Sequence, residues 1–109
     1  MTSPAGPGEP LRRLVLRPGA ARELDEAFAW YEGQSEGLGT EFLRALDAAF
    51  AAIRRTPELY PVVRGRTRRA LLRRFPYGVF YAADGEDVVV LAVVHARRHP
   101  RVWQRRAEG

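Results

Sequence analysis

The sequence contains no cysteine and no lysine among its 109 residues. Without cysteine the chain can form neither a disulfide framework nor a thiolate metal site, so the composition favours a reducing, cytoplasmic setting. The longest unbroken apolar run, residues 88–94, is far shorter than the roughly 18 residues that a membrane span requires. No basic stretch leads into an apolar segment near the N-terminus, which argues against an export signal. We therefore expect a cytoplasmic protein with no membrane partner, no metal and no cofactor.

The basic residues are all arginines, and they are distributed unevenly. Residues 1–54 hold six arginines against eight acidic residues, whereas residues 55–109 hold twelve against five. The net charges of the two halves are therefore −2 and +7, which sum to the +5 of the whole chain. Arginine stays protonated, so it binds phosphate or carboxylate but cannot act as a general base. We expect the C-terminal half to attract nucleic acid or an acidic protein segment.

The first half of the chain predicts a helical hairpin. Residues 1–10 are rich in proline, glycine and small side chains, so we expect a flexible tail before a single domain over residues 11–106. Residues 11–16 form a short strand candidate. Two amphipathic helices follow, one from Pro18 to about Ser35 and one from a capping Thr40 to about Arg55. Their short connection contains glycine and favours an antiparallel arrangement.

The second half predicts a three-stranded antiparallel meander. Residues 68–75 and 78–83 are rich in aromatic and aliphatic side chains and indicate two strands. The turn signal over residues 84–87 contains Gly85, which accepts a positive φ. Residues 88–94 are apolar at every position, as is typical of a central strand covered on both faces. The chain is therefore expected to be of the α+β class.

Two segments flank this meander. Residues 59–65 are interpreted as a loop that leads into the sheet, and residues 101–106 as a short C-terminal helix with Trp103 as its one large apolar residue. The predicted order is strand, helix, helix, three strands and a short helix. No internal repeat is visible.

Two histidines are the only side chains whose unperturbed pKa lies near neutrality. His95, in the last strand, is interpreted either as a structural, hydrogen-bonded residue or as part of an acid–base pair. His99, before Pro100, is interpreted either as a helix cap or solvated residue or as the second member of that pair. The sequence shows no carboxylate pair, metal-spaced histidine cluster, glycine-rich phosphate loop or serine nucleophile motif that competes with them.

Arginines and aromatic residues near the sheet are the candidates for binding a target or an antagonist. They are Arg73, Arg74, Tyr77, Arg97, Arg98 and Trp103. On a strand, Arg73 and Arg74 would point to opposite faces, so only one of them could line a given surface. The same holds for Arg97 and Arg98. Solvated charge that discourages pairing between sheet edges is the alternative interpretation of each arginine. Phe75 and Phe80 are expected to pack in the core.

The order of these elements resembles that of the RelE/ParE superfamily, toxins encoded with an antitoxin in bacterial type II toxin–antitoxin operons. The resemblance covers about residues 12–104. The residues that carry it are Pro18, Leu24, Tyr31, Arg73, Tyr77, Tyr81, Val94, His95, Arg97 and Arg98. It implies a helical hairpin covering one face of a twisted, mainly antiparallel sheet, with the antitoxin's C-terminal segment wrapped over a concave, basic opposite face.

The resemblance also implies one of two activities. RelE-like members cleave messenger RNA on the ribosome, whereas ParE-like members bind and poison DNA gyrase. The positions that RelE-like members use for catalysis fall on Arg69, Leu71, Gly78, Arg97 and Trp103 in this sequence, and only Arg97 has the side chain that they use.

These departures favour a ParE-like binding toxin, neutralised by the acidic C-terminal segment of a cognate antitoxin, over a catalyst. The alternatives are a ribosome-dependent endoribonuclease with a rearranged site built on Arg97, His95 and His99, and a non-toxic basic binding domain.

Overall fold

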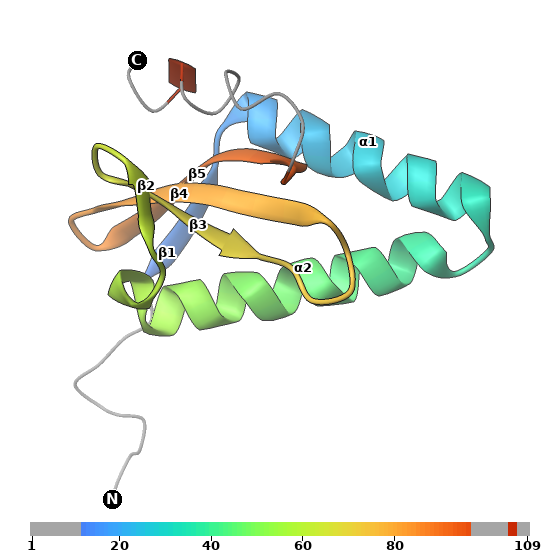
Figure 1. Cartoon of the computed structure of the whole chain (residues 1–109), viewed down its shortest axis with the longest axis horizontal. Coiled ribbons are helices and arrows are strands. Elements are labelled where there is room, and N and C mark those ends of the chain that lie inside the picture. The colour runs from blue at the N-terminus through green and yellow to red at the C-terminus, as the bar shows by residue number, and fades with distance from the viewer. Residues whose placement is uncertain (1–11, 97–104, 107–109) are drawn as a thin grey trace, which may run out of the picture.

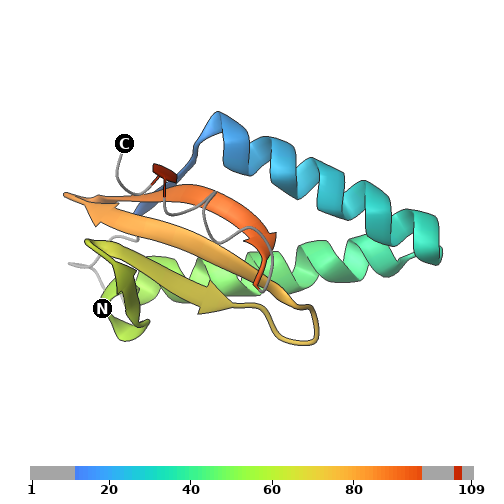
Figure 2. The ribbon, with the colours of Figure 1, turned by 45° about the horizontal axis from the view of Figure 1, so that its top comes forward.

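The structure is a computed structural model that describes residues 12–96 and 105–106. The elements in chain order are β1 (Arg13–Leu16), α1 (Pro18–Gln34), α2 (Leu38–Arg55), the short 3₁₀ helix η1 (Pro57–Leu59), β2 (Val62–Arg64), β3 (Thr67–Leu71), β4 (Tyr77–Asp84) and β5 (Asp87–His95). Five strands form one curved sheet in the order β1-β5-β4-β3-β2 (Figure 2). Only β1 and β5 pair in parallel. The predicted α+β class and helical hairpin are confirmed.

The sheet confirms the predicted meander and extends it at both edges. Strands β3, β4 and β5 are antiparallel neighbours, and Gly85 turns the chain between β4 and β5 with a φ of +63°. The apolar run 88–94 lies in β5, which pairs with both β1 and β4, although β4 is the middle strand. The prediction of a loop over residues 59–65 was wrong, because β-branched Val62 and Val63 allow β2 to pair with β3.

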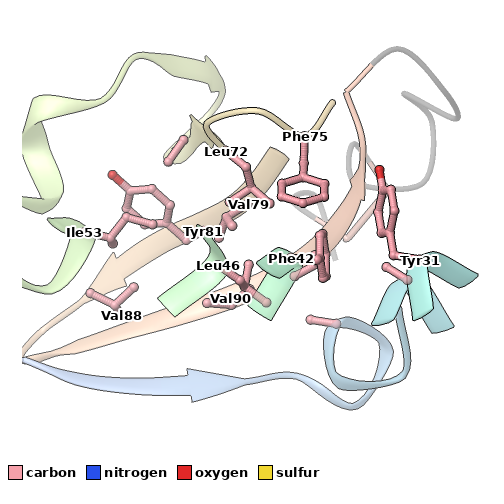
Figure 3. Packing of buried hydrophobic residues seen from close by; sticks show 14 residues of the cluster. Tyr31, Phe42, Leu46, Ile53, Leu72, Phe75, Val79, Tyr81, Val88 and Val90 are labelled. Atoms are coloured by element: carbon pink, nitrogen blue, oxygen red, sulfur yellow. The ribbon is translucent and has the colours of Figure 1, made fainter. Parts of the chain in front are cut away.

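The two helices cover one face of the sheet and share a core with it. Tyr31 of α1 stacks on Phe42 of α2 at a ring separation of 5.3 Å, and Phe75 meets both rings edge-on at 4.9 and 5.5 Å. Tyr81 of β4 is fully buried, and its hydroxyl donates a hydrogen bond to the carbonyl of Pro57 at 2.5 Å. Figure 3 shows these side chains among the aliphatic residues of the same cluster, Leu46, Ile53, Leu72, Val79, Val88 and Val90.

A carboxylate from α1 fixes the turn between the helices. Glu32 accepts hydrogen bonds from the backbone N–H groups of Gly37 and Gly39, each at 2.9 Å, and so binds the first turn of α2. The predicted cap Thr40 instead lies inside the helix, because Gly37 adopts the left-handed conformation at the N-cap. A Cβ on Gly39 would lie 2.8 Å from the Phe28 carbonyl oxygen, so this glycine permits the close approach of the helices. The hairpin tip projects past the sheet (Figure 1).

A bulge in β5 lies beside α1. Phe80 pairs with Ala92 and Tyr81 with Val90, so Leu91 is an extra residue without a partner on β4. On the other edge of β5, the carboxylate of Glu23 accepts the backbone N–H of Val93 at 3.0 Å and a guanidinium N–H of Arg106 at 2.9 Å. Arg106 also donates to the Leu91 carbonyl at 3.1 Å. These bonds satisfy backbone groups of β5 that lie past the end of its pairing with β1.

Within the described ranges, no helix is long and apolar enough to cross a membrane. The predicted helix over residues 101–106 falls mostly outside these ranges, and the predicted tail over residues 1–10 falls entirely outside them.

Candidate functional site

Four of the predicted site residues gather at one end of the sheet. Tyr77 begins β4 and His95 ends β5, and the two are register partners with ring centroids 5.7 Å apart. Arg73 and Arg74 lie in the connection that leads from β3 to Tyr77. The other four predicted residues, Arg97, Arg98, His99 and Trp103, lie outside the described residues.

The prediction that Arg73 and Arg74 occupy a strand was wrong. β3 ends at Leu71, and the connection closes with a hydrogen bond from the backbone N–H of Leu72 to the Tyr77 carbonyl at 2.9 Å. Arg74 has a φ of +71° and is the one non-glycine residue in the described ranges with a positive φ. A continuing strand cannot contain this conformation, and for a side chain other than glycine it costs about 1 to 2 kcal/mol.

An aromatic groove lies between α1 and the adjacent ends of β4 and β5. Its volume is about 520 Å³, and its lining includes Glu23, Glu26, Trp30, Tyr31, Tyr77 and His95. Trp30 is 57% exposed and meets the ring of Tyr31 edge-on at 5.0 Å. An exposed tryptophan beside a concave surface is a typical anchor for a binding partner.

The groove is acidic as well as aromatic. Glu23 and Glu26 are the charged residues of its described lining, and Glu23 is ion-paired with Arg106 at 2.9 Å, so Glu26 is the carboxylate without a described ion-pair partner. Burial, with a smaller contribution from the neighbouring Tyr77, raises the pKa of Tyr31. A phosphodiester chain would meet the Glu26 carboxylate here, whereas an apolar or basic side chain would meet a favourable surface.

Trp30 was not among the residues predicted from sequence. It lies next to Tyr31 in α1, outside the apolar positions Ala20, Ala27 and Tyr31 that the helix buries. An aromatic residue outside the apolar stripe of an amphipathic helix was the available signal.

A second concave surface, which we name the arginine hollow, lies on the other side of the 72–76 connection. Its volume is about 590 Å³, and it is lined by Glu41, Arg44, Ala45, Arg73, Arg74 and Phe75. Arg74 and Glu41 form an ion pair with a nitrogen–oxygen distance of 3.0 Å. Arg44 of α2 belongs to this site although sequence reasoning did not select it; its position on the polar face of α2 gave no signal beyond its charge.

The three described positions that the RelE/ParE resemblance assigns to RNA cleavage, Arg69, Leu71 and Gly78, meet on the sheet face opposite the helices. Leu71 pairs with Gly78, and Arg69 pairs with Phe80 on the same face. A Cβ on Gly78 would lie 3.4 Å from the Arg69 side chain and 3.2 Å from the Phe80 ring. The Nε of Arg69 is buried and has no hydrogen-bond partner. This group of residues therefore contains one permanent cation and no described side chain able to take a proton from a ribose hydroxyl.

No group of three or more histidine, aspartate or glutamate side chains is placed to hold a metal ion within residues 12–96 and 105–106.

Together the sheet order, the helical hairpin and the two concave surfaces define a small α+β domain of the RelE/ParE fold. A family model described as the ParE toxin of the type II toxin–antitoxin system parDE matches residues 14–100. The chain belongs to this family and is a type II toxin.

Comparison with solved structures gives the same fold. A chain of the chromosomal ParDE toxin–antitoxin system from P. aeruginosa superposes with a TM-score of 0.70 at 14% sequence identity, covering 80% of this chain and 98% of that one. A search of curated proteins gave no match.

Proposed function

We propose that this toxin inhibits growth by binding DNA gyrase, and that the acidic C-terminal segment of a cognate antitoxin neutralises it. The observation that carries the proposal is the match of the ParE toxin family over residues 14–100. A binding mode of action fits a chain whose recognisable surfaces are concave and charged.

The geometry of the sheet supports binding over RNA cleavage. Cleavage through a ribose 2′-hydroxyl requires a base, a proton donor for the leaving oxygen and cations around the phosphorane. On the face opposite the helices, Leu71 and Gly78 supply none of these groups, and Arg69 supplies only a cation. His95, the described member of the alternative acid–base pair, lines the aromatic groove beside α1.

The two concave surfaces are the proposed antitoxin contacts. Arg73 and Arg74 in the arginine hollow suit the carboxylates of an acidic segment, and Tyr77 with Trp30 in the aromatic groove suits its apolar side chains. Because the surfaces share the 72–76 connection, one extended segment can reach both.

The target is tested with purified protein. We expect the toxin to inhibit supercoiling of relaxed plasmid DNA by gyrase and to leave messenger RNA intact in a reconstituted translation reaction. RNA cuts that require the ribosome and disappear in His95→Ala would refute the gyrase proposal and favour the endoribonuclease alternative.

Toxicity itself is tested by inducing the gene alone in a bacterium. Growth arrest that is relieved when the adjacent reading frame is co-expressed is the expected result. Normal growth at high, soluble expression would instead indicate a non-toxic binding domain.

A further inference from the structure

We propose that the arginine hollow is a carboxylate-binding site for an acidic polypeptide segment, and that Glu41 occupies it in the free protein as an internal ligand that the partner displaces. This inference depends on the proposed function only for the identity of the partner, the antitoxin. The binding site itself is argued from the residues that line the hollow.

The hollow has more positive charge than its own carboxylate neutralises. Arg44, Arg73 and Arg74 face one acidic residue, Glu41, so the net charge of the lining is +2. Arg44 and Arg73 are exposed and make no hydrogen bond or ion pair with a described residue. Each guanidinium has five N–H donors, and most of these donors are therefore available to an incoming anion.

Glu41 shows which chemistry the hollow accepts. Its carboxylate oxygen lies 3.0 Å from a terminal nitrogen of Arg74, in the position that a partner's carboxylate would take. The side chains of Arg74 and Glu41 are 76% and 50% exposed, and ion pairs this open to solvent are weak and exchange readily. A partner carboxylate that contacts Arg44 and Arg73 as well as Arg74 gains contacts that Glu41 does not make.

The surroundings favour a polypeptide over a nucleic acid. Phe75 and Ala45 give the hollow apolar lining, which suits the aliphatic part of a glutamate or a neighbouring leucine. Beyond the 72–76 connection, the aromatic groove contains Glu26, which would repel a continuing phosphate backbone, whereas the charge of Glu23 is paired with Arg106. A segment that is acidic where it contacts the hollow and apolar where it contacts the groove matches both surfaces.

The backbone at Arg74 is consistent with a functional role. Its positive φ places a long charged side chain where glycine would be accommodated without strain. The exposed ion pair between Arg74 and Glu41 stabilises the protein only weakly, so it does not by itself offset the cost of this conformation. Strain of this kind concentrates at binding and catalytic sites, where partner contacts use the residue that it positions.

The test uses three short probes and measures binding by two-dimensional nuclear magnetic resonance. The first probe is a capped octapeptide of sequence Glu-Ala-Glu-Leu-Glu-Ala-Glu-Leu. The second has glutamine at every glutamate position, and the third is single-stranded DNA of eight nucleotides. We expect the acidic peptide to shift the backbone amides of residues 41–45 and 73–75, and the glutamine peptide to leave them unchanged.

Four variants locate the contacts. Arg44→Gln and Arg73→Gln should each weaken binding of the acidic peptide by about three- to tenfold, the range for one charge-assisted contact. Arg22→Gln removes an exposed helical arginine outside the hollow and should change the affinity by less than about twofold. Glu41→Gln removes the internal competitor and should tighten binding by about two- to threefold.

Glu86→Gln, in the turn before β5, supplies the matched charge control for Glu41 because it changes the net charge equally outside the hollow. The inference is overturned if Glu41→Gln has no larger effect than Glu86→Gln, or if the glutamine peptide binds as tightly as the acidic one. It is also overturned if the DNA probe shifts the same amides at lower concentration. Since the titration involves neither gyrase nor growth, its failure is distinguishable from failure of the proposed function.

Discussion

Replacing Glu32 by alanine tests how the helical hairpin is held. The carboxylate accepts two backbone N–H groups at the start of α2, each at 2.9 Å, in a partly buried position. Loss of an N-terminal cap costs about 0.5 to 2 kcal/mol, and loss of a negative charge at a helix N-terminus costs about 0.3 to 1 kcal/mol more. We therefore expect Glu32→Ala to lower the free energy of unfolding by about 2 kcal/mol.

Urea denaturation followed by circular dichroism measures this change. With m close to 1 kcal/mol/M, as expected for a domain of this size, the midpoint should fall by about 2 M, and Tm by about 8 to 16 °C. Glu32→Gln keeps one carbonyl acceptor and should lose about half as much.

The matched control is Glu36→Ala, which removes an exposed carboxylate from the same inter-helix connection without removing a cap. If Glu32→Ala unfolds at the same urea concentration as the wild type, or if the control is equally destabilised, the capping argument is wrong. The variant also bears on the arginine hollow, because fraying of the first turn of α2 would release Glu41 from Arg74.

Three further predictions concern the core, the hairpin and the groove. Burial raises the pKa of the Tyr81 hydroxyl to about 12 from 10.0, so the neutral form is favoured on folding. The contribution of Tyr81 to stability should be full below pH 10 and should be lost from there to about pH 12. Tyr81→Phe should reduce this decline in pH-dependent urea unfolding, leaving the part due to the raised pKa of Tyr31, and should cost about 1 to 2 kcal/mol at neutral pH through the unpaired Pro57 carbonyl. Gly39→Ala should destabilise by about 2 kcal/mol or more in the same assay because the new methyl group meets backbone, and a wild-type midpoint would contradict that packing. Trp30→Ala should leave the free energy of unfolding within about 0.5 kcal/mol of the wild-type value but weaken antitoxin binding in calorimetry by at least tenfold, and unchanged affinity would exclude Trp30 as an anchor.

The sequence predicts the helices and the meander well because local signals determine them. Pro18 starts α1, the apolar spacing of Phe42, Leu46 and Ile53 gives the buried face of α2, and Gly85 marks the hairpin turn. The cap at Glu32 is different, because the carboxylate lies in one helix and its donors begin the next. Such a contact depends on the angle between the helices, which periodicity does not specify.

The candidate site was harder to predict because its residues come together through a turn. Alternation along a strand assigned Arg73 and Arg74 to opposite faces. In the structure β3 ends at Leu71 and Arg74 adopts a positive φ. Phe75 then packs in the core against Tyr31 and Phe42. No residue type in that segment predicts a positive φ. Sequence reasoning therefore found the arginines but not the hollow that they share with α2.

The charge of the two surfaces constrains how a partner can run across this end of the sheet. Phe75 lines the arginine hollow, Tyr77 lines the aromatic groove, and both rings pack against Tyr31, so packed aromatic rings lie between the two surfaces. A uniformly acidic segment would gain contacts at Arg73 and Arg74 but would meet the Glu26 carboxylate after crossing these rings. The segment that fits both surfaces must therefore change from acidic to apolar or basic over a few residues. An antitoxin with that order of side chains would bind in one direction only, because reversal would place its acidic residues beside Glu26 and remove them from Arg73 and Arg74.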